Sequence, residues 1–147
     1  MSRVADVLEA RAIRLGGTAT TREGAIDEAG RLLIESGAVE ESYLAAMHER
    51  EESVSTFMGN GLAIPHGTNE AKSAIKRTAI SFVHYPDTIE WKGQPAEFVV
   101  GIAGAGDDHL TVLSTLAGVF SDEDEIARLR AATSPEDVIA ILSDVTV

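Results

Sequence analysis

The chain of 147 residues contains no cysteine. This absence excludes a disulfide framework, a thiolate nucleophile and a cysteine-based zinc site, and it fits a reducing compartment. Aromatic residues make up only 5% of the chain, whereas 44% of its residues are apolar, so a core must consist mainly of leucine, isoleucine, valine and alanine. The length fits a single domain, which we place at residues 1–147.

Long apolar runs are also missing. The longest apolar stretch, Phe98 to Ala105, is much shorter than the roughly 20 residues that cross a bilayer. The first residues lack the basic start and the apolar core of a secretory signal. We therefore expect a cytoplasmic protein without direct membrane insertion.

Basic residues are scarce, because 12 lysines and arginines face 24 aspartates and glutamates, for a net charge of −12. Such a surface repels nucleic-acid phosphates and anionic lipid, so we expect no nucleic-acid partner. The acidity would steer a protein partner with a basic face toward the chain, or it serves solubility alone.

Apolar spacing and turn signals predict a three-layer α/β sandwich with a sheet of four to five strands and helices on both faces. A capping box from Thr20 to Glu23 opens the first long helix, and Gly37 ends it. Helices are expected at 3–10, 20–36, 40–52, 110–120, 122–131 and from 134 onward. Strands are expected near 13–15 and at 61–64, 78–84, 88–91 and 98–103.

One histidine, His66, lies between a proline and a glycine at the end of a short apolar run. Pro65 fixes its own φ, and Gly67 allows a sharp turn or a close approach of another molecule to the backbone. The pattern predicts an exposed imidazole on a rigid turn, which can give a ring nitrogen to a visiting partner. The alternative is a histidine that only closes a turn.

The other histidines differ in context. His109 follows the Gly104–Gly106 loop and opens a helix, and a helix N-terminus favours anions such as phosphate. It can also be a helix-start residue that bonds only to its neighbours. His48, amid charged residues on a helix, is expected on a solvated face, and His84, at a strand end, is expected to be structural.

Motifs of several enzyme classes are missing from the chain. There is no His-Glu-x-x-His pair for zinc, no Gly-x-Ser-x-Gly elbow for a serine hydrolase and no Walker loop for ATP. We therefore expect neither a metal nor a cofactor.

The segment from Gly61 to Lys72, which begins Gly-Leu-Ala-Ile-Pro-His-Gly-Thr, resembles the phosphorylation site of the mannitol/fructose-type EIIA (EIIA type-2) proteins. These belong to the bacterial phosphoenolpyruvate-dependent sugar phosphotransferase system. The segments from Tyr43 to Glu51 and from Val100 to His109 also resemble this family, and the mannitol branch most closely. The similarity extends from about residue 10 to the C-terminus.

The resemblance implies that the phosphocarrier protein HPr phosphorylates His66, on Nε2, and that His66 passes the group to an EIIB domain of a membrane sugar permease. His109 matches the second active-site histidine of the family and Arg50 an arginine near the site, so both are expected to stabilise the phosphoryl group. No cofactor is implied, and the family fold is a mixed sheet covered by helices.

Two functions follow from the resemblance. The first is a phosphotransferase in sugar transport, which the mannitol-like stretch from Thr68 to Lys72 favours. The second is a regulatory interaction module whose phosphorylation state controls partner proteins. The segment from Thr88 to Glu97 resembles the fructose or nitrogen-regulatory branches, and the two aspartates before His109 add negative charge beside the site.

Overall fold

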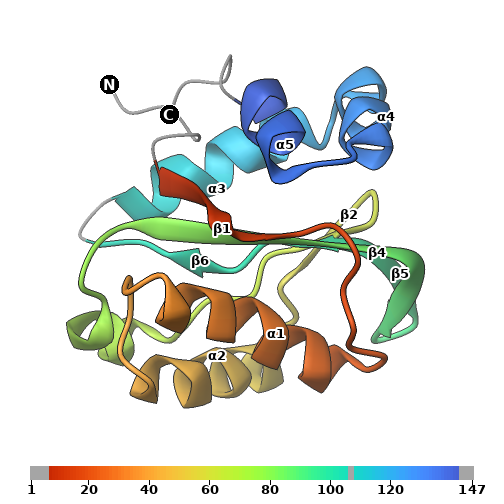
Figure 1. Ribbon diagram of the computed structural model, residues 1–147. Coiled ribbons are helices and arrows are strands. Elements are labelled where there is room, and N and C mark those ends of the chain that lie inside the picture. The colour runs from red at the N-terminus through yellow and green to blue at the C-terminus, as the bar shows by residue number, and fades with distance from the viewer. Residues whose placement is uncertain (1–6, 106–107, 143–147) are drawn as a thin grey trace.

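The computed structural model describes residues 7–105 and 108–142, except the side chains of Asn69, Asp108, His109 and Thr111. In this part of the chain, two helices cover one face of a sheet and three cover the other (Figure 1). The first two are α1 (Arg22–Glu35) and α2 (Ser42–Ser53), and the other three are α3 (Asp108–Val119), α4 (Glu123–Ala131) and α5 (Pro135–Leu142). The strands are β1 (Leu8–Arg14), β2 (Phe57–Gly59), β3 (Leu62–Ala63), β4 (Ala79–Trp91), β5 (Gln94–Val99) and β6 (Ile102–Ala103), and a 3-10 helix, η2, spans Asn69–Ala74.

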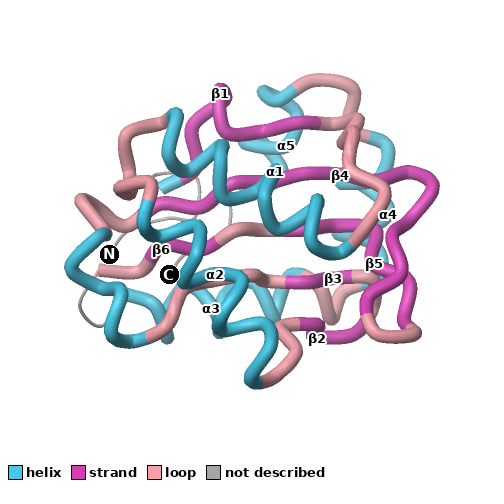
Figure 2. The backbone as a smooth tube through the Cα atoms, turned by 90° about the horizontal axis from the view of Figure 1, so that it is seen from below, coloured by secondary structure: helices cyan, strands magenta, loops and turns pink. Residues whose placement is uncertain are grey.

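The sheet of the described residues has six strands in the order β1-β4-β5-β3-β2, with β6 also paired to β4 (Figure 2). Strands β1 and β4 are parallel, as are β3 and β5, whereas β4 and β5 are antiparallel. The sheet is therefore mixed. The prediction of a three-layer α/β sandwich is confirmed; the described sheet has five strands in its main order, and the two-residue β6 adds a sixth to the four to five expected.

Two apolar clusters fill the space on the two faces of the sheet. The cluster beneath α1 and α2 includes Leu33, Met47 and Trp91, and the cluster beneath α3, α4 and α5 includes Phe98 and Leu116. All five side chains are at most 1% exposed. Burial of each such side chain is worth about 1.5–3 kcal/mol, which holds the helices against both faces.

Several element predictions are wrong in detail. The segment from Leu8 onward is a strand and not the end of a helix, because β1 pairs with the buried β4 and Leu8 is itself buried. The first long helix is capped by Thr21 rather than Thr20, since the Thr21 hydroxyl accepts a hydrogen bond from the Gly24 amide. Residues 3–6 lie outside the described part.

The two strands expected at 78–84 and 88–91 are one long strand, β4. A register shift between His84 and Ile89 absorbs the extra residues, with Thr88 in the left-handed region at φ 59°. The run expected at 98–103 divides into β5 and β6, yet both keep one register with β4, as Val99 pairs with Val83 and Ile102 with Ile80.

After β3, the chain through Pro65 and His66 keeps running parallel to the segment from β5 to β6. The Ile102 amide donates to the Pro65 carbonyl at 3.0 Å, and His66 forms a parallel bridge with Ile102. Because the parallel segments end at one edge of the sheet, His66 and Gly104 lie at that edge. Both line the same pocket, described below.

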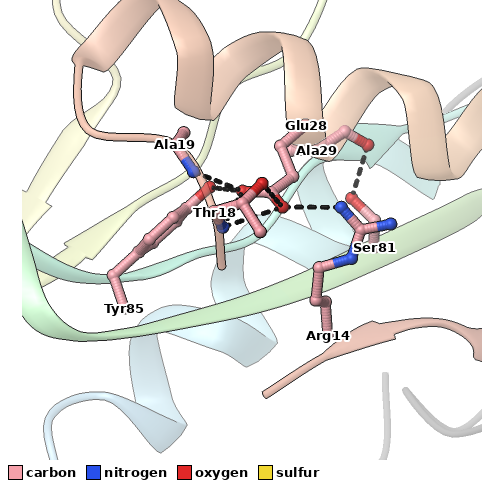
Figure 3. A network of polar contacts seen from close by, with 7 residues as sticks. All are labelled: Arg14, Thr18, Ala19, Glu28, Ala29, Ser81 and Tyr85. Atoms are coloured by element: carbon pink, nitrogen blue, oxygen red, sulfur yellow. Dashed lines mark hydrogen bonds and ion pairs between the residues drawn. The ribbon is translucent and has the colours of Figure 1, made fainter. Parts of the chain in front are cut away.

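A buried carboxylate ties α1 to the first and fourth strands (Figure 3). Glu28 accepts hydrogen bonds from the Arg14 guanidinium at 2.6 Å, from the Thr18 amide at 3.1 Å, from the Ala19 amide at 3.3 Å and from the Tyr85 hydroxyl. Burial raises the pKa of Glu28, but these bonds outweigh it and lower the pKa to about 2. The network therefore stabilises the fold only while Glu28 is ionised.

We expect the folded protein to lose about 3 kcal/mol of unfolding free energy through Glu28 as the pH falls. Since the folded pKa is depressed from 4.5 to about 2, this stability is complete above about pH 5 and is lost toward pH 2. Urea unfolding from pH 7 to pH 2 measures it. The loss will shrink in Glu28→Gln and persist in the exposed control Glu41→Gln; equal acid sensitivity in all three proteins contradicts the prediction.

Candidate active site

His66 is a buried residue in the lining of a pocket rather than a residue on an open surface. The exposed imidazole predicted from the Pro65–Gly67 pattern is wrong, because His66 is only 8% exposed. The backbone bridge to Ile102 places the residue beside the sheet instead of on a projecting turn. The side chain still lines the pocket, so a visiting group meets it there.

The contacts of the His66 ring set its protonation. Nδ1 lies 2.8 Å from the Ile64 carbonyl oxygen, which can only accept, so Nδ1 carries the proton and the lone pair of the neutral ring is on Nε2. Burial lowers the pKa of His66 below 6.5, the Ile64 bond opposes this, and the Arg50 charge lowers the pKa further. The ring is therefore neutral and nucleophilic at neutral pH.

The pocket has a volume of about 350 Å³ and gathers residues from four parts of the chain. Tyr43 and Arg50 come from helix α2. Polar residues come from η2 and the segment just before it, and Gly104 follows β6. The lining consists of Tyr43, Arg50, His66, Gly67, Thr68, Glu70, Lys72, Ile75 and Gly104. The two cations, Arg50 and Lys72, exceed the one acid, Glu70, in this lining, which suits an anionic group on the neutral imidazole.

Arg50, predicted from the sequence, does lie with His66 in the pocket. Its Nη1 donates to the Val54 carbonyl at 2.8 Å, which holds the guanidinium at the end of α2. The next residue, Glu51, is 1% exposed and accepts hydrogen bonds from the Thr56 amide at 3.1 Å and the Trp91 indole at 3.0 Å. These bonds fix the turn that carries the Val54 carbonyl.

No role for Tyr43, Lys72 or Glu51 is predicted from the sequence. A signal for Tyr43 was present, since it precedes Arg50 by seven residues and therefore shares its helix face. Lys72 lies within the motif segment, but nothing in the spacing indicates that η2 turns it toward the pocket. In the sequence, Glu51 cannot be distinguished from surface acids. Its burial depends on Trp91, which is distant in sequence.

Of the other three histidines, the structure describes the side chains of His48 and His84 but not that of His109. His109 is the second residue of α3, and its side chain lies outside the described part of the structure, so its role stays a prediction. His84 is buried, bonds Glu97 at 2.9 Å and stacks on Phe98, as expected for a structural residue. His48 is partly exposed and bonds Asp27 at 2.7 Å.

Among the side chains that the structure describes, which exclude those of Asp108 and His109, no three histidine, aspartate or glutamate residues come together in a way that could hold a metal ion. The helices of the same described part are all too short or too polar to cross a membrane.

The model of the family described as phosphoenolpyruvate-dependent sugar phosphotransferase system, EIIA 2, matches residues 6–145. The mannitol-specific phosphotransferase enzyme IIA component of Bacillus subtilis is 47% identical over 95% of this chain and 98% of its own length. The protein of the same name from Halalkalibacterium halodurans is 42% identical over 95% and 96%.

Solved structures agree with these relatives. The complex of enzyme IIAMTL with phosphorylated enzyme IIBMTL from Escherichia coli contains a chain with TM-score 0.85 and 36% identity, over 93% of this chain and 99% of that one. The crystal structure of Escherichia coli IIA mannitol gives TM-score 0.83 and 38% identity, over 91% and 97%.

A helix-covered mixed sheet with a histidine pocket at one edge is thus the fold of a phosphotransferase component. The chain belongs to the EIIA 2 family of the phosphoenolpyruvate-dependent sugar phosphotransferase system.

Proposed function

We propose that His66 accepts a phosphoryl group from phospho-HPr on Nε2 and passes it to an EIIB domain of a mannitol-type permease. The observation that carries the proposal is the bond from Nδ1 to the Ile64 carbonyl, which leaves the lone pair on Nε2 of a ring that shares a pocket with Arg50. In the transfer, the bond from Nε2 to phosphorus forms as the bond from phosphorus to the donor breaks.

The pocket supplies what this reaction needs. Phosphoryl transfer passes through a loose transition state whose charge lies on three equatorial oxygens, so catalysis consists of positioning and electrostatic stabilisation. Arg50 offers several N–H donors and a fixed charge to those oxygens. A neutral His66 attacks without first losing a proton, and its lowered pKa keeps it neutral.

Support for mannitol comes from the relatives. The curated relatives at 42–47% identity are named mannitol-specific, and the Escherichia coli complex pairs a IIA chain with phosphorylated IIBMTL. The nitrogen regulatory protein IIA-Ntr from Neisseria meningitidis is less similar, at 28% identity. These relatives support our proposal that the protein acts in sugar transport in the cytoplasm, with HPr and EIIB as partners, rather than in regulation.

Incubation with phosphoenolpyruvate, enzyme I and HPr tests the proposal. We expect one acid-labile phosphate, mapped to His66, which a mannitol-type EIIB domain removes faster than a fructose-type one. Label on another residue contradicts the assignment of His66. Label on His66 that no permease EIIB domain removes favours the regulatory alternative.

We expect His109→Ala to slow this transfer by about tenfold and still to allow labelling of His66, because it removes one hydrogen-bond donor and keeps the nucleophile. Rapid-quench measurement of labelling by phospho-HPr tests it. An unchanged rate removes His109 from the site, and complete loss of label assigns it a larger role than stabilisation.

A further inference from the structure

We propose that Tyr43 is a positioning residue for transfer at His66, which it serves by holding the His66 backbone to β6 and to the helix that carries Arg50. This inference rests on the proposed function, since it concerns the efficiency of that same transfer. Tyr43 acts through two backbone groups, the amide of Gly67, which follows His66 in the chain, and the carbonyl of Ile102, its bridge partner.

The Tyr43 hydroxyl joins two backbone groups that flank His66. It accepts a hydrogen bond from the Gly67 amide at 2.9 Å and donates one to the Ile102 carbonyl at 2.8 Å. Gly67 follows His66 in the chain, and Ile102 is its bridge partner on β6. One side-chain atom therefore fixes the spacing between the histidine segment and the sheet edge, in a residue that is only 2% exposed.

Gly67 permits this contact by lacking a side chain. A Cβ built on Gly67 meets Cε1 of the Tyr43 ring at 2.5 Å and Cζ at 2.9 Å, whereas the φ angle of Gly67 lies outside the left-handed region. The glycine is thus needed for the close approach of an aromatic ring, not for an unusual turn. The group that approaches the Gly67 backbone is therefore the Tyr43 ring of the same chain.

Tyr43 and Arg50 share one face of α2, two helical turns apart, with the fully buried Met47 between them. Helix α2 therefore carries both the clamp on the His66 segment and the guanidinium that lines the pocket. The distance between nucleophile and cation is set by this one rigid element. A small misplacement of reacting groups is enough to slow a transfer by orders of magnitude, which gives the clamp kinetic importance.

Loss of stability alone does not distinguish positioning from an ordinary core contact, because any buried tyrosine that loses its hydroxyl leaves partners unpaired. The chain offers a matched control. Tyr85 is 3% exposed and its hydroxyl also makes a buried hydrogen bond, to Glu28 (Figure 3). Among the described residues, neither Tyr85 nor Glu28 lines the His66 pocket.

The test compares wild type, Tyr43→Phe and Tyr85→Phe in phosphorylation by phospho-HPr, at a temperature where all three are folded. We expect Tyr43→Phe to lower the maximal rate about tenfold or more with an unchanged KM for phospho-HPr. Tyr85→Phe will stay within twofold of wild type. Gly67→Ala keeps the Tyr43 hydroxyl but pushes the Tyr43 ring away, so we expect the same loss of maximal rate. This variant replaces Tyr43→Phe in the test if Tyr43→Phe does not fold.

A second readout follows the His66 ring by NMR. In Tyr43→Phe the loosened segment admits water, so the pKa of His66 will rise toward 6.5, whereas Tyr85→Phe leaves it unchanged. Maximal rates within twofold of wild type in Tyr43→Phe or Gly67→Ala, or a change confined to KM, overturn the inference. Wild-type protein that carries no label on His66 overturns the proposed function instead, and is recognised before any variant is compared.

Discussion

His66→Ala protein will take up no phosphate from phospho-HPr. The substitution removes the nucleophilic Nε2, and the described residues that line the pocket include no second imidazole to replace it. We expect labelling with radioactive phosphoenolpyruvate in the presence of enzyme I and HPr to fall to the background of a reaction without the protein.

The matched control for this loss is His48→Ala. His48 is a partly exposed histidine whose ring bonds Asp27, outside the pocket, so its removal will leave labelling unchanged. Circular dichroism of both variants confirms that the fold persists, which is expected because alanine at position 66 keeps the backbone bridge to Ile102. Full labelling of His66→Ala would remove the central residue from the proposal.

The local parts of the fold and site were open to prediction from sequence. The Pro65–Gly67 motif marks His66, and the apolar spacing of α1 and α2 marks helices that cover a sheet. The position of Arg50 follows from the resemblance of its segment to the family. In each case the signal lies within about ten residues, where periodicity and turn chemistry operate.

The parts that could not be predicted depend on contacts between distant segments. The burial of His66 follows from its bridge to Ile102, 36 positions away, and the clamp on Gly67 comes from Tyr43 on another element. The carboxylate of Glu28 reads as one of 24 acidic residues until Tyr85 and Arg14 are brought against it. Which acid is buried is decided by tertiary packing.

The same packing explains how a strongly acidic protein can hold a phosphoryl group. Glu51, the acid next to Arg50, directs its oxygens to Thr56 and Trp91, and its charge still acts on His66, whose pKa it raises. Glu97 is likewise taken up by His84 and Arg130. The net charge of −12 therefore does not describe the pocket, where Arg50 and Lys72 outnumber Glu70 among the described lining residues.

Arg50→Gln will slow phosphoryl transfer to His66 by about 10²–10³-fold, which corresponds to about 3–4 kcal/mol of transition-state stabilisation. Glutamine keeps much of the side-chain length and a donor but loses the fixed charge and the forked N–H groups. Rapid-quench kinetics with saturating phospho-HPr measures the loss, and Arg31→Gln, an exposed arginine that pairs with Glu41, will behave as wild type.

The same variant carries an independent electrostatic signature. Because the positive charge of Arg50 contributes to lowering the pKa of His66, its removal will raise that pKa, as followed by NMR titration of the ring. Arg50→Lys, which keeps the charge but not the fork, will leave the pKa near its wild-type value and recover only part of the rate. If Arg50→Gln is slow but the His66 pKa is unchanged, the guanidinium lies too far from the ring to act on it. The loss of rate would then come from weaker docking of phospho-HPr.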